Sequence, residues 1–146
     1  MQKIELLAPA GDMEKLKTAV RYGADAVYFG GEVFSLRAGA GNLTVDEMKE
    51  AMEFLHAHGA KGYLTINIYP HNEDIQPLQE YIQQIRDIPI DAFLVSDPGV
   101  MQLVKYGIPN AEIHLSTQAN TTNYLSANFW VSQKIFPLLT PTTECG

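Results

Sequence analysis

A histidine stands two residues before a serine in the stretch HLSTQAN, residues 114–120. A serine hydroxyl next to a histidine is the pattern of a nucleophile with its activating base. In a strand, however, residues two apart have Cβ atoms about 6–7 Å from each other, whereas a base must come within about 2.6–3.2 Å of its nucleophile. We therefore expect that His114 does not activate Ser116, and we assign no catalytic residue from this pattern.

The same stretch has a second interpretation as the polar carboxyl end of a strand. In a barrel of parallel strands, active sites form at the carboxyl ends of the strands. Ser116, Gln118 and Asn120 would then be candidate substrate-binding residues that orient a ligand through donors and acceptors. Structural hydrogen bonding at the end of the strand explains the same residues equally well, and the sequence leaves both interpretations open.

Other expected strand ends carry polar residues as well. Asn67 shares a strand face with Tyr69 and is a candidate substrate-binding residue. Asp97 follows a further apolar run and precedes Pro98, so it is either a general base at the mouth of a barrel or the cap of a helix. Capping is the favoured interpretation because proline is common in the first position of a helix.

Three glycines and one arginine are candidates for binding an anion. Gly11 precedes an expected helix, whose first backbone amides are able to hold a carboxylate or phosphate. Gly30 and Gly31 end the second expected strand. Arg37 lies in the glycine-rich loop beyond them and suits bidentate binding of a carboxylate or phosphate. A plain turn at Gly11 and a solvated surface arginine are the alternatives.

The sequence shows no pattern for a metal site or a known protease. His56 and His58 are two residues apart on an expected helix and therefore do not face each other. Neither H-E-x-x-H nor G-x-S-x-G occurs in the chain. We expect no metal site, and no cofactor held by this chain.

Short apolar runs alternate with segments of helical periodicity along the chain. Helix starts are indicated by Asp12, by Thr44 with Glu47 at capping-box spacing, by Asp74, by Pro98 and by Asn123. The predicted strands cover residues 4–9, 25–31, 62–70, 91–97 and 111–117.

Strands separated by helices predict an α/β protein with a parallel sheet. No G-x-G-x-x-G follows the first strand, which favours a TIM-barrel-like (β/α) arrangement over a dinucleotide-binding fold. We expect about five β/α units, in residues 1–133, as the amino-terminal part of a barrel domain. Residues 134–146 show no period and predict an irregular tail without a clean sixth strand. Because a complete barrel needs about 250 residues, we expect the chain to be cut short.

The 146 residues are 46% apolar and 18% charged with a net charge of −7, which is typical of a globular protein in solution. The ten lysines and arginines are scattered, so no basic stripe for nucleic acid is visible. No run approaches the roughly 18 apolar residues of a membrane span, and a signal peptide is not expected. We expect a cytoplasmic protein, which also fits the single Cys145, and one that associates with itself through the open edges of its sheet.

Three phrases carry a family resemblance: ELLAPAGDMEKLKTAVRYGADAVYFGG, FSLRAGAGN and HLSTQANTTN. In this order they closely resemble the amino-terminal part of the collagenase-like peptidase family, peptidase U-32. The resemblance covers residues 4–130, and the sequence departs from the family pattern from about Lys134.

The resemblance implies a (β/α)-barrel-like fold and two possible activities. Members are usually named peptidases, while several bacterial members are linked to prephenate-dependent hydroxylation of transfer RNA, ribosomal RNA or a ubiquinone precursor. The substrate would be a peptide, an RNA or a small acidic molecule. Many members bind an iron–sulfur cluster through four cysteines, none of which matches Cys145. A non-catalytic truncated product that folds only on self-association or with a partner is the alternative.

Overall fold

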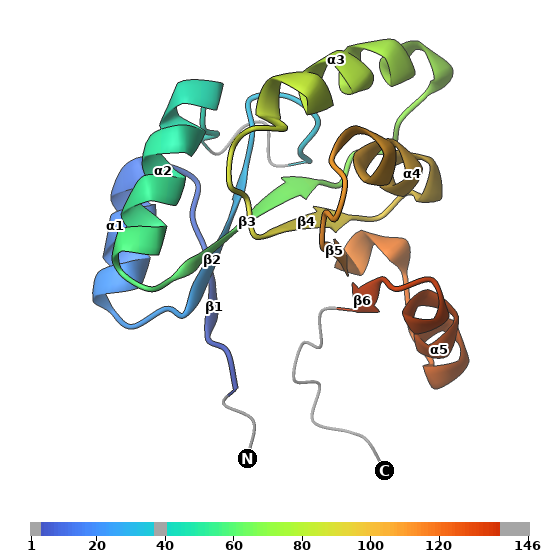
Figure 1. Ribbon diagram of the computed structural model, residues 1–146. Coiled ribbons are helices and arrows are strands. Elements are labelled where there is room, and N and C mark those ends of the chain that lie inside the picture. The colour runs from blue at the N-terminus through green and yellow to red at the C-terminus, as the bar shows by residue number, and fades with distance from the viewer. Residues whose placement is uncertain (1–3, 37–40, 138–146) are drawn as a thin grey trace.

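The computed structural model describes residues 4–36 and 41–137, and these form one parallel sheet with its helices. The six strands pair in chain order, each parallel to the next, as the α/β prediction required. They are β1 (Leu7–Pro9), β2 (Ala26–Gly30), β3 (Lys61–Ile66), β4 (Ala92–Val95), β5 (Ile113–Leu115) and β6 (Phe136–Pro137). The helices lie along the outer side of this curved row of strands (Figure 1). The arrangement is that of a partial (β/α)-barrel.

Four of the five α-helices in the described residues begin after a residue whose side chain caps the first turn. The helices are α1 (Met13–Arg21), α2 (Val45–Ala57), α3 (Ile75–Ile85), α4 (Pro98–Gly107) and α5 (Tyr124–Ser132), with 3-10 turns η1 (Asn72–Asp74) and η2 (Thr117–Ala119). The side chains of Asp12, Asp97 and Asn123 each accept a backbone N–H from the first turn of the helix that follows. Such caps satisfy amides that have no partner within the helix.

The central strands β2, β3 and β4 are buried on both faces of the sheet. Alternate residues of each strand point to opposite faces, so each strand contributes to two clusters. Val27 and Phe29 of β2 belong to the large core shared with the helices. Ala26 belongs instead to a smaller inner cluster with Tyr63, Ala92 and Leu94. Burial on both sides is typical of parallel sheets and explains why the strands read as continuous apolar runs.

The end of the described chain corrects one expectation. The sequence predicted no sixth strand, yet Phe136–Pro137 pair in parallel with β5. A two-residue strand that contains a proline is too short to show the alternation of apolar and polar residues that predicts a strand. It is recognised only by its pairing with β5. Within the described residues no helix has the length and hydrophobicity needed to cross a membrane.

Candidate functional site

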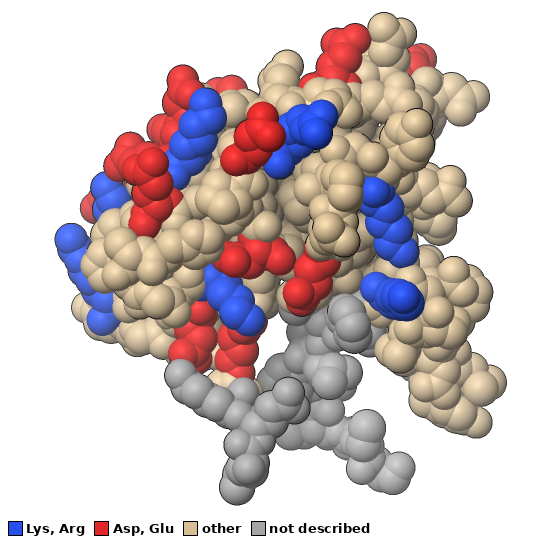
Figure 2. All heavy atoms as spheres, in the orientation of Figure 1, with Lys and Arg blue, Asp and Glu red and all other residues tan. Residues whose placement is uncertain are grey.

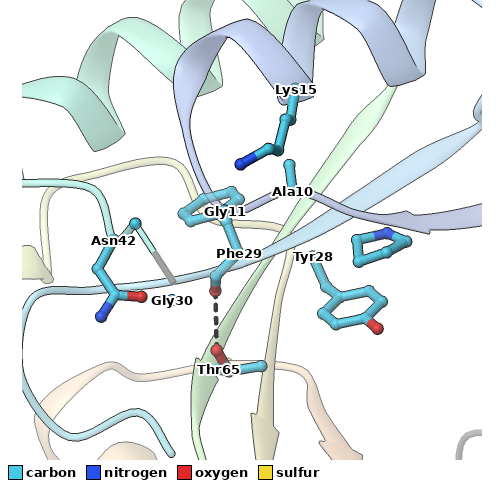
Figure 3. A pocket seen from close by; sticks show the side chains of 10 residues that line it. Ala10, Gly11, Lys15, Tyr28, Phe29, Gly30, Asn42 and Thr65 are labelled. Carbon is cyan, nitrogen blue, oxygen red and sulfur yellow. Dashed lines mark hydrogen bonds between the residues drawn. The ribbon is translucent and has the colours of Figure 1, made fainter. Parts of the chain in front are cut away.

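A cavity of about 230 Å³ lies at the carboxyl ends of β1, β2 and β3 (Figure 3). This is the end of the strands where barrel enzymes carry their sites. Figure 3 shows Lys15 of α1 on one side of the cavity, Asn42 on another and Thr65 of β3 below. Its lining residues are Pro9, Ala10, Gly11, Lys15, Tyr28, Phe29, Gly30, Gly41, Asn42 and Thr65.

Glycines allow the cavity walls to come close to one another. A Cβ on Gly30 would stand 2.7 Å from the Ser35 hydroxyl and 2.8 Å from the Asn42 side-chain oxygen. A Cβ on Gly41 would stand 2.6 Å from the backbone oxygen of Gly11, and Gly41 has a φ of +77°, which favours glycine. The glycines Gly11 and Gly30, predicted as anion-binding backbone, thus line one cavity.

Asn42 supplies an acceptor to this cavity. Its Oδ1 atom is buried and has no hydrogen-bond partner among the residues that the structure describes. A buried polar atom without a partner costs free energy, and a donor group on a bound ligand would remove that cost. By contrast, the Thr65 hydroxyl already donates to the backbone oxygen of Phe29 at 2.9 Å and lies 3.4 Å from the Ser35 hydroxyl.

The amino end of α1 is held by its own carboxylate. Asp12 accepts the backbone N–H of Lys15 at 2.8 Å, and its other oxygen lies 2.7 Å from the Lys15 ammonium. The hydrogen bond from the Lys15 side chain is the main reason why the pKa of Asp12 is lowered. The same bond raises the pKa of Lys15. The predicted cap at Asp12 is confirmed, and an anion beside Gly11 would meet a helix end that is already partly neutralised.

Hydrogen bonds connect the ends of neighbouring strands beyond this cavity. The Asn67 side-chain oxygen accepts the backbone N–H of Leu36 at 3.2 Å, and the Asn67 backbone oxygen accepts the Ser96 hydroxyl at 3.4 Å. Farther along, the Tyr69 hydroxyl donates to the Gln118 side-chain oxygen at 2.6 Å. Asn67 and Gln118 each have a structural hydrogen bond at the carboxyl end of the strands.

The remaining predicted site residues do not line this cavity in the described structure. Asp97 accepts the backbone N–H of Val100 at 3.0 Å, so the favoured interpretation as a helix cap is confirmed. Gly31 packs against Tyr81 and Met48 rather than lining the cavity. Asn120 ends η2, and its backbone has the left-handed conformation with a φ of 54°. Arg37 lies outside the described residues.

His114 and Ser116 use different partners. His114 Nε2 lies 2.7 Å from a carboxylate oxygen of Glu112, and its ring meets the edge of the Tyr63 ring with centroids 4.9 Å apart. Ser116 is buried, and its hydroxyl accepts the backbone N–H of Gln118 at 3.4 Å. These contacts agree with the expectation that the pair is not a nucleophile with its base.

The sequence interpretation missed Lys15, Tyr28, Asn42 and Thr65. Thr65 had a usable signal, since it stands two residues before Asn67 and so shares its strand face. Asn42 ends a glycine-rich stretch of the sequence, and nothing in its local pattern shows that it lies beside Gly30 at the end of β2. Its place beside Gly30 comes from tertiary contacts, among them the hydrogen bond of 3.0 Å from the Leu43 backbone N–H to the Gly30 backbone oxygen.

The fold and the cavity define a (β/α)-barrel-type protein with a site at the carboxyl ends of its strands. Residues 11–138 match the family model of peptidase family U32. The chain belongs to this family, as the resemblance in its sequence indicated.

Two curated relatives carry different names. The chain is 45% identical to tRNA hydroxylation protein P1 of Bacillus subtilis over 129 residues, which are 88% of this chain and 31% of that protein. It is 40% identical to an uncharacterized protease of Methanocaldococcus jannaschii, with 89% of this chain and 31% of that protein covered. The chain thus spans about a third of the length of these relatives.

The chain is also similar to a third relative and to one solved structure. The 23S rRNA 5-hydroxycytidine synthase of Escherichia coli is 36% identical over 87% of this chain and 19% of its own length. The solved structure of a U32 peptidase superposes with a TM-score of 0.68 at 13% identity, over 87% of this chain and 54% of that chain. At this identity the structural likeness shows the fold.

An iron–sulfur cluster does not fit the residues present. A cluster held by four cysteines needs thiolate donors, and the chain has one cysteine, Cys145, outside the described residues. Among the residues described, no group of three or more His, Cys, Asp or Glu side chains is placed to hold a metal ion.

Proposed function

We propose that this chain is the substrate-binding, amino-terminal part of an RNA hydroxylation protein. The observation that carries the proposal is the 45% identity to a tRNA hydroxylation protein over 88% of the chain. The cavity at the carboxyl ends of β1–β3 supports it, since that is where this architecture binds ligands. A cytoplasmic location follows from an RNA substrate, and any iron–sulfur cluster would be held by cysteines outside these 146 residues.

The residues of the site have separate tasks in this proposal. The Asn42 acceptor fixes a donor group of the ligand inside the cavity. Arg37 and the backbone at Gly11 and Gly30 hold a negatively charged group of the ligand. Polar residues at the other strand ends orient the rest of the substrate, and these are Asn67, Ser116, Gln118 and Asn120.

Proteolysis has less support from the geometry. The side chains of His56, His58 and His114 hydrogen-bond to carboxylates or to a backbone oxygen. His114 is paired with Glu112, and His56 with Asp91 at 2.9 Å. The name of the Methanocaldococcus jannaschii relative is the observation that favours the protease interpretation.

A chimera tests the proposal because the chain covers only part of its relatives. The chain would replace the matched 129 residues of tRNA hydroxylation protein P1 in a Bacillus subtilis strain that lacks both P1 and the related protein P2. We expect hydroxylated tRNA nucleosides to return, measured by mass spectrometry, and Asn42→Ala to lower their amount at least about tenfold, the loss of one buried hydrogen bond to ligand.

The matched control is Gln102→Ala, which removes an exposed side-chain amide on α4 and which we expect to leave hydroxylation unchanged. A soluble, folded chimera that restores no hydroxylation would overturn the proposal. Release of peptides from casein by the same chimera would instead support the protease interpretation.

A further inference from the structure

A second cavity, of about 290 Å³, lies between α2, α3 and the segment that follows β2, and is here called the α2–α3 pocket. It shares no lining residue with the cavity of the candidate site. Val33, Val45 and Pro77 form part of its apolar wall. Its charged lining residues are Glu32, just after β2, and Glu80 of α3, and no lysine, arginine or histidine of the described chain lines it. The pocket therefore joins an apolar wall to two negative charges.

The charge of these two carboxylates is not balanced within the described residues. No cation of the described segments forms an ion pair with Glu32 or Glu80. The Glu80 carboxylate accepts a hydrogen bond from the neutral side chain of Gln76 at 3.2 Å. By contrast, acidic and basic side chains lie intermixed around α1 and α2 (Figure 2), where Lys17 pairs with Glu50. A cationic ligand would supply the missing counter-charge to the pocket.

The Tyr81 hydroxyl adds a buried polar atom to the same pocket. Tyr81 lines the pocket and is 6% exposed. Its hydroxyl donates a weak hydrogen bond to Sδ of Met48 at 4.0 Å, and from the described part of the chain its oxygen accepts none. Burial raises the pKa of Tyr81, and the negative charge of Glu32 raises it further, so the hydroxyl keeps its proton at neutral pH. A hydroxyl oxygen accepts as well as donates, so an N–H of a bound cation would find an acceptor here.

We propose that the α2–α3 pocket binds a free aliphatic diamine, whose ammonium groups contact Glu32 and Glu80 and whose methylene chain packs on the apolar wall. Two ammonium groups match the two carboxylates in number, and hydrogen bonds between charged groups are stronger than neutral ones. The methylene chain leaves water when the apolar wall covers it, which is favourable. The Tyr81 oxygen accepts a further N–H of the ligand. This second site does not depend on RNA hydroxylation.

Other cations fit the pocket less well. Mg²⁺ and Ca²⁺ take about six to eight oxygen ligands, whereas the side chains of Val33, Val45 and Pro77 offer none. Within the described residues no group of three or more His, Cys, Asp or Glu side chains is placed to hold a metal ion. A lysine side chain of another protein would bring one ammonium group to two carboxylates. The charge and the apolar wall together therefore favour a diamine.

NMR titration of the isotopically labelled chain with putrescine, an unbranched diamine, tests the proposal. We expect saturable shifts in the backbone amides of residues that line the pocket, among them Glu32, Val33 and Glu80. Added salt should weaken the binding, because it screens the exposed carboxylates. n-Butanol has a similar carbon chain without a charge and should cause no saturable shift.

Three substitutions separate the pocket from the general acidity of the chain. Glu32→Gln keeps the size of the side chain and should weaken putrescine binding about fivefold, as the loss of one exposed ion pair does. Tyr81→Phe should weaken it roughly threefold through the lost acceptor. Glu53→Gln is the matched control, because Glu53 is an exposed glutamate of α2 that does not line the pocket. It removes the same charge and should leave the binding unchanged.

Four results would overturn the proposal. One is the absence of saturable shifts up to about 10 mM putrescine, and another is equal weakening by Glu32→Gln and Glu53→Gln. Binding of the acetylated amide of lysine as tight as that of putrescine would make a lysine side chain the occupant. Tighter binding of Mg²⁺ at the same amides would make it a metal ion. If the chain alone does not fold, calorimetric titration of the chimera described above, with the same ligands and variants, decides between the same outcomes.

Discussion

At the scale of single residues, Gly31 shows how a small side chain sets the end of a strand. A Cβ at this position would overlap the Tyr81 hydroxyl and would stand 2.7 Å from Cε of Met48. Tyr81 belongs to α3 and Met48 to α2, so both helices approach β2 at this glycine. The sequence suggested an anion-binding role for Gly31, and the structure adds a packing reason for glycine there.

We expect Gly31→Ala to lower the free energy of unfolding by about 1–3 kcal/mol, as overpacking of a core does. Tyr81→Phe removes the overlapping oxygen, which donates a weak hydrogen bond to Sδ of Met48 at 4.0 Å. In a Tyr81→Phe background, Gly31→Ala should therefore lower the free energy of unfolding by clearly less than in the wild-type background. Urea unfolding of the four proteins measures the coupling, and equal costs in both backgrounds would contradict the explanation.

The Asp12–Lys15 pair predicts a pH dependence. The folded pKa of Asp12 is lowered from its ordinary value of 3.8, so the folded state favours the charged carboxylate. Its contribution to stability is present above pH 3.8 and is lost as the pH falls through the lowered pKa. NMR titration of the Asp12 carboxyl should give a midpoint below 3.8, and Lys15→Met should raise it. The backbone N–H of residue 15 remains, so the rise should be partial. A wild-type midpoint above 3.8 would contradict this.

At the scale of elements, α2 has the most complete amino-terminal cap in the described chain. The Thr44 hydroxyl accepts the backbone N–H of Glu47 at 3.1 Å, and the Glu47 carboxylate accepts the backbone N–H of Thr44 at 2.8 Å. The sequence predicted this capping box from the spacing of the two residues. The same helix carries Met48, Met52 and Leu55 into the core beneath β2 and β3, so the cap fixes a helix on which the core depends.

Loss of this cap should be measurable as a loss of stability. We expect Thr44→Ala to lower the free energy of unfolding by about 1 kcal/mol, and Thr44→Ser to lower it less because the hydroxyl remains. Thr18→Ala on α1 is the control. The Thr18 hydroxyl donates to the backbone oxygen of Glu14 in its own helix. Thr18→Ala should therefore change the free energy of unfolding by no more than about 0.5 kcal/mol. Equal effects of Thr44→Ala and Thr18→Ala in urea unfolding would contradict the role of the cap.

At the scale of the whole molecule, the sheet is strongest in its middle. β2, β3 and β4 have a paired strand on both sides and are buried on both faces. β6 has two residues and one described neighbour, and the α5 that packs on it has no buried residue. The two ends of the sheet therefore differ from its middle in both hydrogen bonding and burial.

We expect native-state hydrogen exchange to follow this gradient. Amides of β3 should exchange most slowly, near the rate set by global unfolding, and amides of α5 should exchange fastest among the helices. Mass spectrometry after peptic digestion of the labelled chain resolves these segments. Uniform protection from β1 to β6 would show that α5 and β6 are covered in the isolated chain.

The sequence by itself determined the order of elements and the places where helices begin. Asp12, Thr44, Asp97 and Asn123 were predicted as helix starts, and all four are caps in the structure. These features are local, because a cap and its amide lie within three residues of each other. The predicted strands extend beyond the observed ones. The third strand ends at Ile66 rather than at Pro70, because apolar residues continue in the sequence beyond the last paired residue.

Only the tertiary structure decided which polar residues share a site. Asn42 lies beside Gly30 and Gly41 lies beside Gly11, and Phe136–Pro137 form a strand by pairing with β5. Both depend on contacts between residues distant in the chain, which no local period encodes. The polar residues at the strand ends could be named from the sequence, but their hydrogen bonds could not, because those bonds depend on how far the sheet curves and which strand ends it brings within about 3 Å of each other.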